Sequence, residues 1–317
     1  MRGRMLGASA RYRGGLSLYG GGLCAAALLC AALLLWDPAV GAEGVRMGLS
    51  LCAGALIPAL FPFLCITPFL SYVTARAVGA RTLGRWGRLL SVFLIGMVAG
   101  FPVGAIGAAR QYRSGLLEKE EAECCLGLCV GASPAFLVGY FGNARWGDVR
   151  LGWWRYAAQG LLCGAAMAVV CMHGKVRGEA WGSGDALTTP PRIAVCIADA
   201  AEAMLGICAS AVFFTVLRGY LHGLFPPLGA LLLGGAAELL GGICECRAAL
   251  DTGLLGSGAA VCLSAFMIGL GGASVMMQCA AAAEEAGLSM RRYVQMRILL
   301  ALGLAGAAAV FCWIWGR

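Results

Sequence analysis

The residues of this sequence best suited to chemistry are a few polar groups inside long apolar runs. Glu238 is surrounded by apolar and glycine residues over 231–243. Ser274 and Gln278 lie in another apolar run, and their spacing places both on one face of a helix. An ionisable group at membrane depth is costly and points to a functional site. We therefore interpret Glu238 as a candidate coupling or gating acid, and Ser274 and Gln278 as candidate substrate ligands.

Each of these residues also has a structural interpretation. Glu238 could be held by Arg218, by Arg247 or by a break in the backbone, and Gln278 could form a hydrogen bond between helices. The sequence leaves both interpretations open.

Helix-breaking residues interrupt two further apolar runs. Gly100, Pro102 and Gly104 lie in one run, and Ser133 precedes Pro134 in another. Proline removes a backbone donor, and lipid cannot satisfy the groups that it frees, so such breaks face protein or a polar cavity. We therefore add Gly100, Pro102, Gly104 and Ser133 to the candidate substrate-binding residues. The spacing of Gly100 and Gly104 also fits simple helix packing through small residues.

The break at Gly100 has a relative late in the chain. Aligning Gly100 with Gly272 also pairs Val103 with Val275. Interrupted apolar segments in matching positions of two halves indicate a transporter-like site at the middle of the membrane. The sequence therefore predicts two structural repeats whose breaks meet.

Composition gives the broad class. Of 317 residues, 60% are hydrophobic and 13% are charged, and the mean hydropathy is +0.81. A soluble domain carries about 25% charged residues, so the sequence predicts a multi-pass membrane protein with the lipid bilayer as its surroundings. The net charge of +8 comes mostly from arginines between apolar runs, which indicates membrane topology and argues against nucleic-acid binding.

No pattern in the sequence indicates catalysis or a metal site. The 16 cysteines lie mostly in apolar runs, and the closest groups lack a histidine or zinc-site spacing. Neither a nucleophile elbow nor a phosphate-binding loop is present, and the chain has two histidines. We expect a protein that is not an enzyme and holds no metal or cofactor.

We predict an all-α fold with about eight or nine hydrophobic segments and interrupted or re-entrant helices. Three parts are expected: an N-terminal membrane half (1–172), a polar linker (173–193) and a C-terminal membrane half (194–317). The basic N-terminus and the basic loop at 76–88 predict a cytoplasmic N-terminus. The expected segments are 19–36, 48–72, 89–109, 124–142, 155–172, 195–220, 227–247, 257–281 and 294–315.

Four short motifs occur in an order that resembles a known family. They are Phe61-Pro62-Phe63, Gly100-Phe101-Pro102-Val103-Gly104-Ala105, Ser133-Pro134-x-Phe136 and Gly271-Gly272-x-Ser274-Val275-x-x-Gln278. Together they resemble the sporulation integral membrane proteins of the YlbJ type, which are related to nucleoside-recognition Gate-domain proteins. The sequence departs from the expected pattern at Val130-Gly131-Ala132, where a polar Asn would precede the Ser-Pro pair.

The resemblance implies a cell-membrane protein of bacterial sporulation, acting in spore cortex or envelope formation. It also implies passage of a small solute, so we expect a transporter or permease-like component. The alternative is a membrane scaffold that transports nothing and assembles spore-envelope factors. Other copies of the chain or other sporulation membrane proteins are the protein partners that these two hypotheses suggest.

Overall fold

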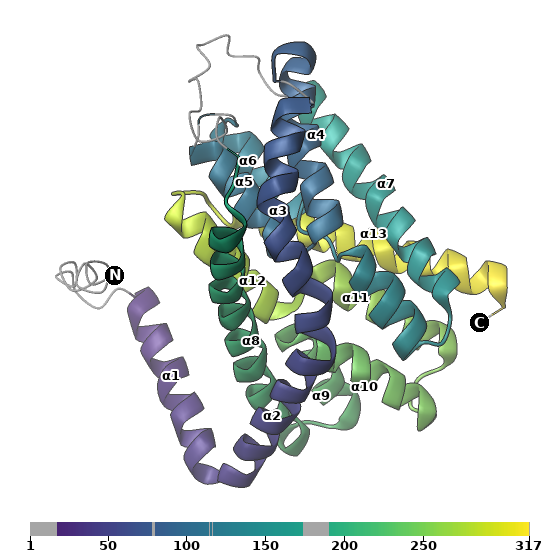
Figure 1. Cartoon of the computed structure of the whole chain (residues 1–317). Helices are drawn as coiled ribbons and strands as arrows, with labels where there is room; N and C mark the ends of the chain where they lie inside the picture. The colour runs from purple at the N-terminus through teal and green to yellow at the C-terminus, as the bar shows by residue number, and fades with distance from the viewer. Residues whose placement is uncertain (1–17, 78–79, 114, 116, 174–189, 317) are drawn as a thin grey trace.

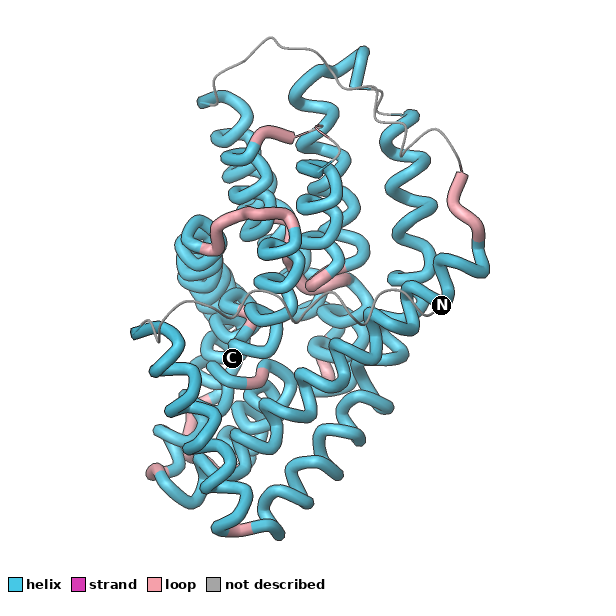
Figure 2. The backbone as a smooth tube through the Cα atoms, turned by 90° about the vertical axis from the view of Figure 1, so that its left-hand side faces the viewer, coloured by secondary structure: helices cyan, strands magenta, loops and turns pink. Residues whose placement is uncertain are grey.

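The computed structural model describes residues 18–77, 80–113, 115, 117–173 and 190–316. All regular structure in these residues is helical, and short loops separate the helices (Figure 2). Most of the predicted linker, residues 174–189, lies outside the described part. In chain order the elements are α1 (Leu18–Trp36), α2 (Pro38–Leu51), the π-helical η1 (Cys52–Leu56), α3 (Ile57–Ala77), α4 (Ala80–Ala99), α5 (Val103–Arg113), α6 (Lys119–Leu128), the π-helical η2 (Ala135–Arg145), α7 (Val149–His173), α8 (Ile193–Leu224), α9 (Pro227–Ala237), α10 (Leu239–Asp251), α11 (Ser257–Leu270), α12 (Gly272–Glu285) and α13 (Arg291–Trp315).

The described residues contain five helices that are long and apolar enough to cross a membrane. The all-helical fold is therefore confirmed, and these helices support a membrane protein. Three shorter apolar helices accompany them, so the count of eight or nine segments stays a prediction. The five are Pro38–Leu70, Val149–Met172, Ile193–Leu224, Ser257–Glu285 and Arg291–Trp315, and the shorter helices are Ala27–Trp36, Trp86–Ala99 and Pro227–Ala237.

Four of the apolar segments are each broken into two helices. The predicted interruptions occur at residues 100–102 and 129–134 and at Gly271, which has a φ of +90°. The fourth interruption, at Glu238, lies inside a segment that we expected to be continuous. Pro62 and Pro68, in contrast, lie within α3 without ending it. Each half of the chain thus has the same order: a long helix, two broken segments and another long helix.

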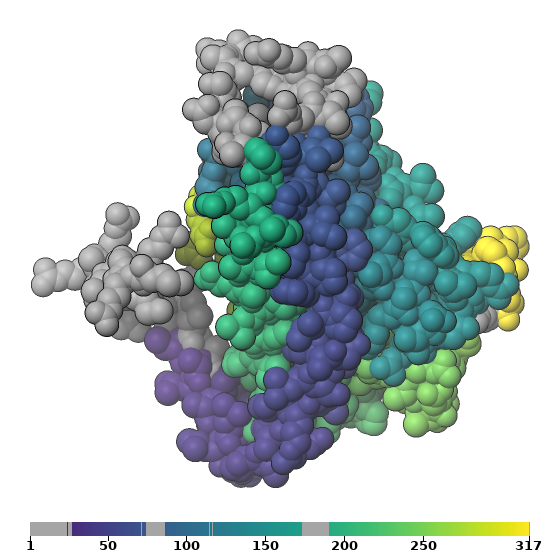
Figure 3. All heavy atoms as spheres, viewed as in Figure 1, coloured from purple at the N-terminus to yellow at the C-terminus, as the bar shows by residue number. Residues whose placement is uncertain are grey.

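The turn between α1 and α2 packs against the end of α8. Asp37 caps α2, since its Oδ1 accepts hydrogen bonds from the amides of Ala39 (3.1 Å) and Val40 (3.2 Å). The Tyr220 hydroxyl donates to the carbonyl of Asp37 at 2.7 Å and fixes this turn against α8. In Figure 1, α1 leans away from the bundle while α2 packs against α8. Figure 3 shows α3 and α8 side by side on one face.

Two glycines of the first broken segment allow direct contact between main chains. A Cβ atom on Gly96 or on Gly104 would overlap the carbonyl oxygen of Cys129. Gly100 has a φ of +78° and lies against the amide of Ser133. The first and second breaks of the N-terminal half are therefore packed backbone against backbone.

This packing predicts that a methyl group at position 104 is not tolerated. Gly104→Ala should destabilise the folded protein by about 1–3 kcal/mol, because the backbone of the second break must move. Unfolding of the purified protein in detergent micelles, followed by circular dichroism, measures the effect. Gly139→Ala is the matched control, since nothing lies within 4 Å of its added Cβ. Equal stability of the two variants would contradict the described packing.

Candidate functional site

A pocket lies where the two halves of the chain meet. It encloses about 340 Å³, including the space at its mouth. Small-molecule pockets are mostly apolar with a few placed polar groups. Its walls are mostly apolar: Leu56, Leu60, Phe101, Phe136, Ile207, Ala211, Leu239, Leu240 and Val275. Its polar residues are Glu238, Ser274 and Gln278.

The beginnings of four half-helices line this pocket. Phe101 precedes α5, Phe136 lies in the first turn of η2, Leu239 begins α10, and Ser274 and Val275 lie in the first turn of α12. A helix N-terminus carries unpaired amides and a partial positive charge. The N-terminal ends of four half-helices, with their partial positive charge, thus border one apolar space.

Glu238 is the acid of the pocket, and the backbone holds it. It ends α9 and caps α10, and its carboxylate accepts hydrogen bonds from the amides of Leu240 (2.9 Å) and Gly241 (2.5 Å). The residue is 3% exposed. Of the three structural interpretations of Glu238, the break in the backbone is therefore the one that holds its carboxylate. Arg218 and Arg247 pair with other acids, Glu245 (2.9 Å) and Asp251 (3.0 Å) respectively.

Ser274 and Gln278 lie one turn apart on α12 and share a polar contact with α8. The Gln278 Nε2 donates to the Ser210 Oγ at 2.6 Å and is 3.4 Å from the Ser274 Oγ. Gln278 therefore forms the bond between helices that the sequence left open, and it also borders the pocket. The structure brings Glu238, Ser274 and Gln278 together from two different broken segments.

The candidate substrate-binding residues of the N-terminal half are not among the residues that line the pocket. Gly100 and Gly104 face the second break, as described above, and Pro102 is not among the residues that line the pocket. The Ser133 Oγ accepts a hydrogen bond from the amide of Phe136 at 3.3 Å and caps η2. The side chains that these breaks present to the pocket are Phe101 and Phe136. Their rings contact each other edge to face, with 6.1 Å between the ring centroids. These breaks contribute shape rather than polar ligands.

Two residues that sequence reasoning missed satisfy the backbone at the breaks. Gln159 of α7 pairs with Ala132, accepting from its amide and donating to its carbonyl, both at 3.0 Å. Arg297 of α13 donates to the carbonyls of Ile268 (3.0 Å) and Leu270 (3.3 Å), and to that of Val130. Each is a polar side chain in an apolar run, and this signal could have identified it.

A second arginine lies in a similar environment. Arg155 of α7 is 2% exposed, and its Nη2 donates to the carbonyl of Ala265 at 3.4 Å. Its Nε and Nη1 are buried without a hydrogen-bond partner. Arg155 and Arg297 thus both reach from a long helix to the backbone of α11.

The described residues contain no group of three or more His, Cys, Asp or Glu side chains that could hold a metal ion. No family model, curated protein or solved structure matches this chain. The assignment of a function therefore depends on the pocket and on the motifs.

We expect Arg297 to be essential for a stable fold. Arg297→Met leaves the carbonyls of Val130, Ile268 and Leu270 without this donor. It should lower the free energy of unfolding by about 3 kcal/mol or more. The measurement is the denaturant midpoint of the purified protein. Arg291→Met, at the exposed start of the same helix, should change it little. Similar midpoints for the two variants would show that the carbonyls are satisfied in another way.

Proposed function

We propose that this chain is a multi-pass membrane transporter for a small solute, which binds in the pocket between the two halves. The observation that carries the proposal is the meeting of Glu238, Ser274 and Gln278 at helix breaks inside an otherwise apolar pocket. Transporters bind solutes at such interrupted helices, where unpaired backbone and a few side chains replace water. Glu238 serves as the coupling or gating acid in this proposal.

The two halves are proposed to be structural repeats, and the order of their elements supports a new register. Gly131-Ala132-Ser133 lies in the second break of its half, and Gly272-Ala273-Ser274 directly follows the second break of its half. In nearly the same register, Arg150 and Arg155 of α7 match Arg292 and Arg297 of α13. This register pairs Gly131, rather than Gly100, with Gly272. The break at Gly100 then corresponds to the break at Glu238.

The proposed setting is the cell membrane of a spore-forming bacterium, and its support is the four motifs that resemble the YlbJ type. The N-terminus is proposed to be cytoplasmic. The basic residues near the α3–α4 turn, among them Arg76 and Arg88, support this orientation. The α1–α2 and α8–α9 turns would then lie at the opposite face.

A transport assay tests the proposal. Purified protein in liposomes is screened for uptake of labelled nucleosides, metal ions and small metabolites, with empty liposomes as the background. We expect saturable uptake of at least one solute. Absence of uptake for the whole panel, from protein shown to be folded, would favour the scaffold alternative.

Glu238→Gln should reduce this uptake at least about tenfold, because an amide replaces the only carboxylate that lines the pocket. The variant also weakens the cap of α10, at a cost of about 1 kcal/mol, so the protein should still fold. Uptake rates are compared at equal amounts of folded protein. Glu284→Gln, on the exposed surface of α12, is the matched control and should transport normally. Normal uptake and normal sporulation with Glu238→Gln would show that Glu238 has no part in the mechanism.

A further inference from the structure

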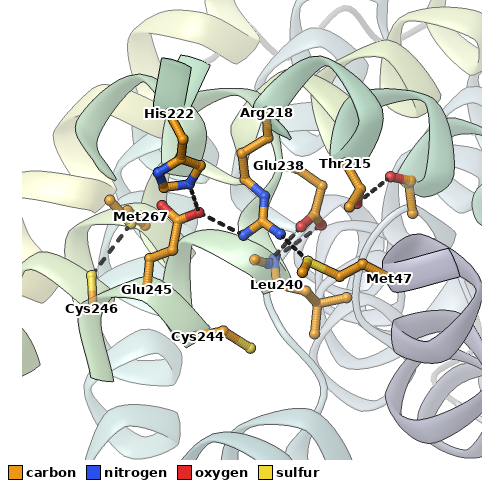
Figure 4. A network of polar contacts seen from close by, with 12 residues as sticks. Met47, Thr215, Arg218, His222, Glu238, Leu240, Cys244, Glu245, Cys246 and Met267 are labelled. Atoms are coloured by element: carbon orange, nitrogen blue, oxygen red, sulfur yellow. Dashed lines mark hydrogen bonds and ion pairs between the residues drawn. The ribbon is translucent and has the colours of Figure 1, made fainter. Parts of the chain in front are cut away.

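A cluster of charged residues connects Glu238 to the surface of the protein (Figure 4). The Nε2 of His222 lies 2.7 Å from the Oε1 of Glu245, and the same oxygen accepts from the Nη1 of Arg218 at 2.9 Å. The guanidinium of Arg218 packs on Gly241, whose amide donates to Glu238. Helices α8 and α10, with the cap of α10, therefore bring one histidine, one arginine and two acids into a row.

Exposure decreases along this row. The side chain of His222 is 51% exposed, that of Glu245 is 15% exposed, and that of Arg218 is 6% exposed. Glu238 is 3% exposed. Water therefore reaches the cluster at His222, near the α8–α9 turn, while the other end borders the pocket.

The buried part of the cluster has one negative charge in excess. Arg218 supplies one positive charge, and Glu238 and Glu245 supply two negative charges when both are ionised. Both interact electrostatically with the same guanidinium. The second amino group of Arg218 lies 2.8 Å from the sulfur of Met47, which is a weak acceptor. A buried charge without compensation is costly, so one further cation stabilises this arrangement.

A proton suits this place better than a metal ion. The Oε2 of Glu245 is buried without a hydrogen-bond partner. A metal ion needs several oxygen or nitrogen ligands, and the described residues offer no such group here. Histidine is the side chain that changes its charge near neutral pH. Two thiols among the described residues also interact electrostatically with the cluster: Cys52 with Glu238, and Cys246 with Glu245. The thiol of Cys244 instead contacts Arg145 and Tyr140.

We propose that His222 and Glu245 form a proton-binding site that controls the charge facing the pocket through Arg218. A proton from water binds Nδ1 of His222, and the proton already on Nε2 can pass to Oε1 of Glu245. His222 is then neutral again and Glu245 is a neutral acid. Arg218 transfers no proton; it loses its ionic partner at Glu245, and Glu238 becomes its one carboxylate partner in the cluster. The use of this site in transport rests on the function proposed above, whereas proton binding itself does not.

Infrared difference spectroscopy tests the site without any solute. The full chain is reconstituted in lipid with His173→Gln, so that His222 is the one histidine left. Shifting the buffer from about pH 8 to about pH 5.5 brackets histidine titration. We expect a carboxylic-acid band from the protonated Glu245, together with a change in the guanidinium bands that reports the altered pairing of Arg218.

The matched variants separate the steps. His222→Gln, which alters an exposed side chain, should abolish both signals. Glu245→Gln should lose both signals and show an imidazolium band instead, because the proton then stays on His222. A guanidinium change that persists in His222→Gln, or that is absent in the His173→Gln protein, would overturn the proposal. Because no solute is present, a failed transport screen leaves this result unaffected, and the two proposals can fail separately.

Discussion

The fold depends on one constraint: backbone groups released at helix breaks must find partners inside the protein. The bilayer interior offers no water for this purpose, so each break has to be satisfied by protein atoms. Arg297 meets the need for two breaks at once, since it binds the carbonyl of Val130 in one half and those of Ile268 and Leu270 in the other. Its guanidinium presents several fixed donors in one plane, which an ammonium group does not.

The same constraint explains how the pocket is built. Gln159 satisfies the amide and carbonyl of Ala132, and Glu238 satisfies the first amides of α10. Glu238 therefore has a structural role and lies in the candidate site at the same time. An acid that caps a helix at such a point keeps its place without a cationic partner in direct contact. The position leaves its charge open to influence from Arg218 and from whatever enters the pocket.

Sequence reasoning identified the class of fold and part of the site. Apolar length and low charge predicted helices in a membrane, and proline and glycine patterns predicted three of the four breaks. A backbone break near Glu238 was one alternative, but the sequence did not place it, because no proline marks it; the acid itself ends one helix and starts the next. Arginines were mostly interpreted as topology signals, so the buried roles of Arg155 and Arg297 were missed. Which breaks pack against each other depends on tertiary contacts that spacing alone does not contain.

The contact of Gly96 and Gly104 with the Cys129 carbonyl has a further consequence for motion. This seam contains main chain on both sides, so no side-chain rotamers are frozen when it forms or released when it separates. Its conformational entropy therefore changes little if the broken segments slide past each other. The interface between the halves, with its aromatic rings and bonded polar side chains, does carry that entropic cost. The glycine seam is thus a place in the N-terminal half where movement costs little conformational entropy, and it joins the two broken segments whose Phe101 and Phe136 line the pocket.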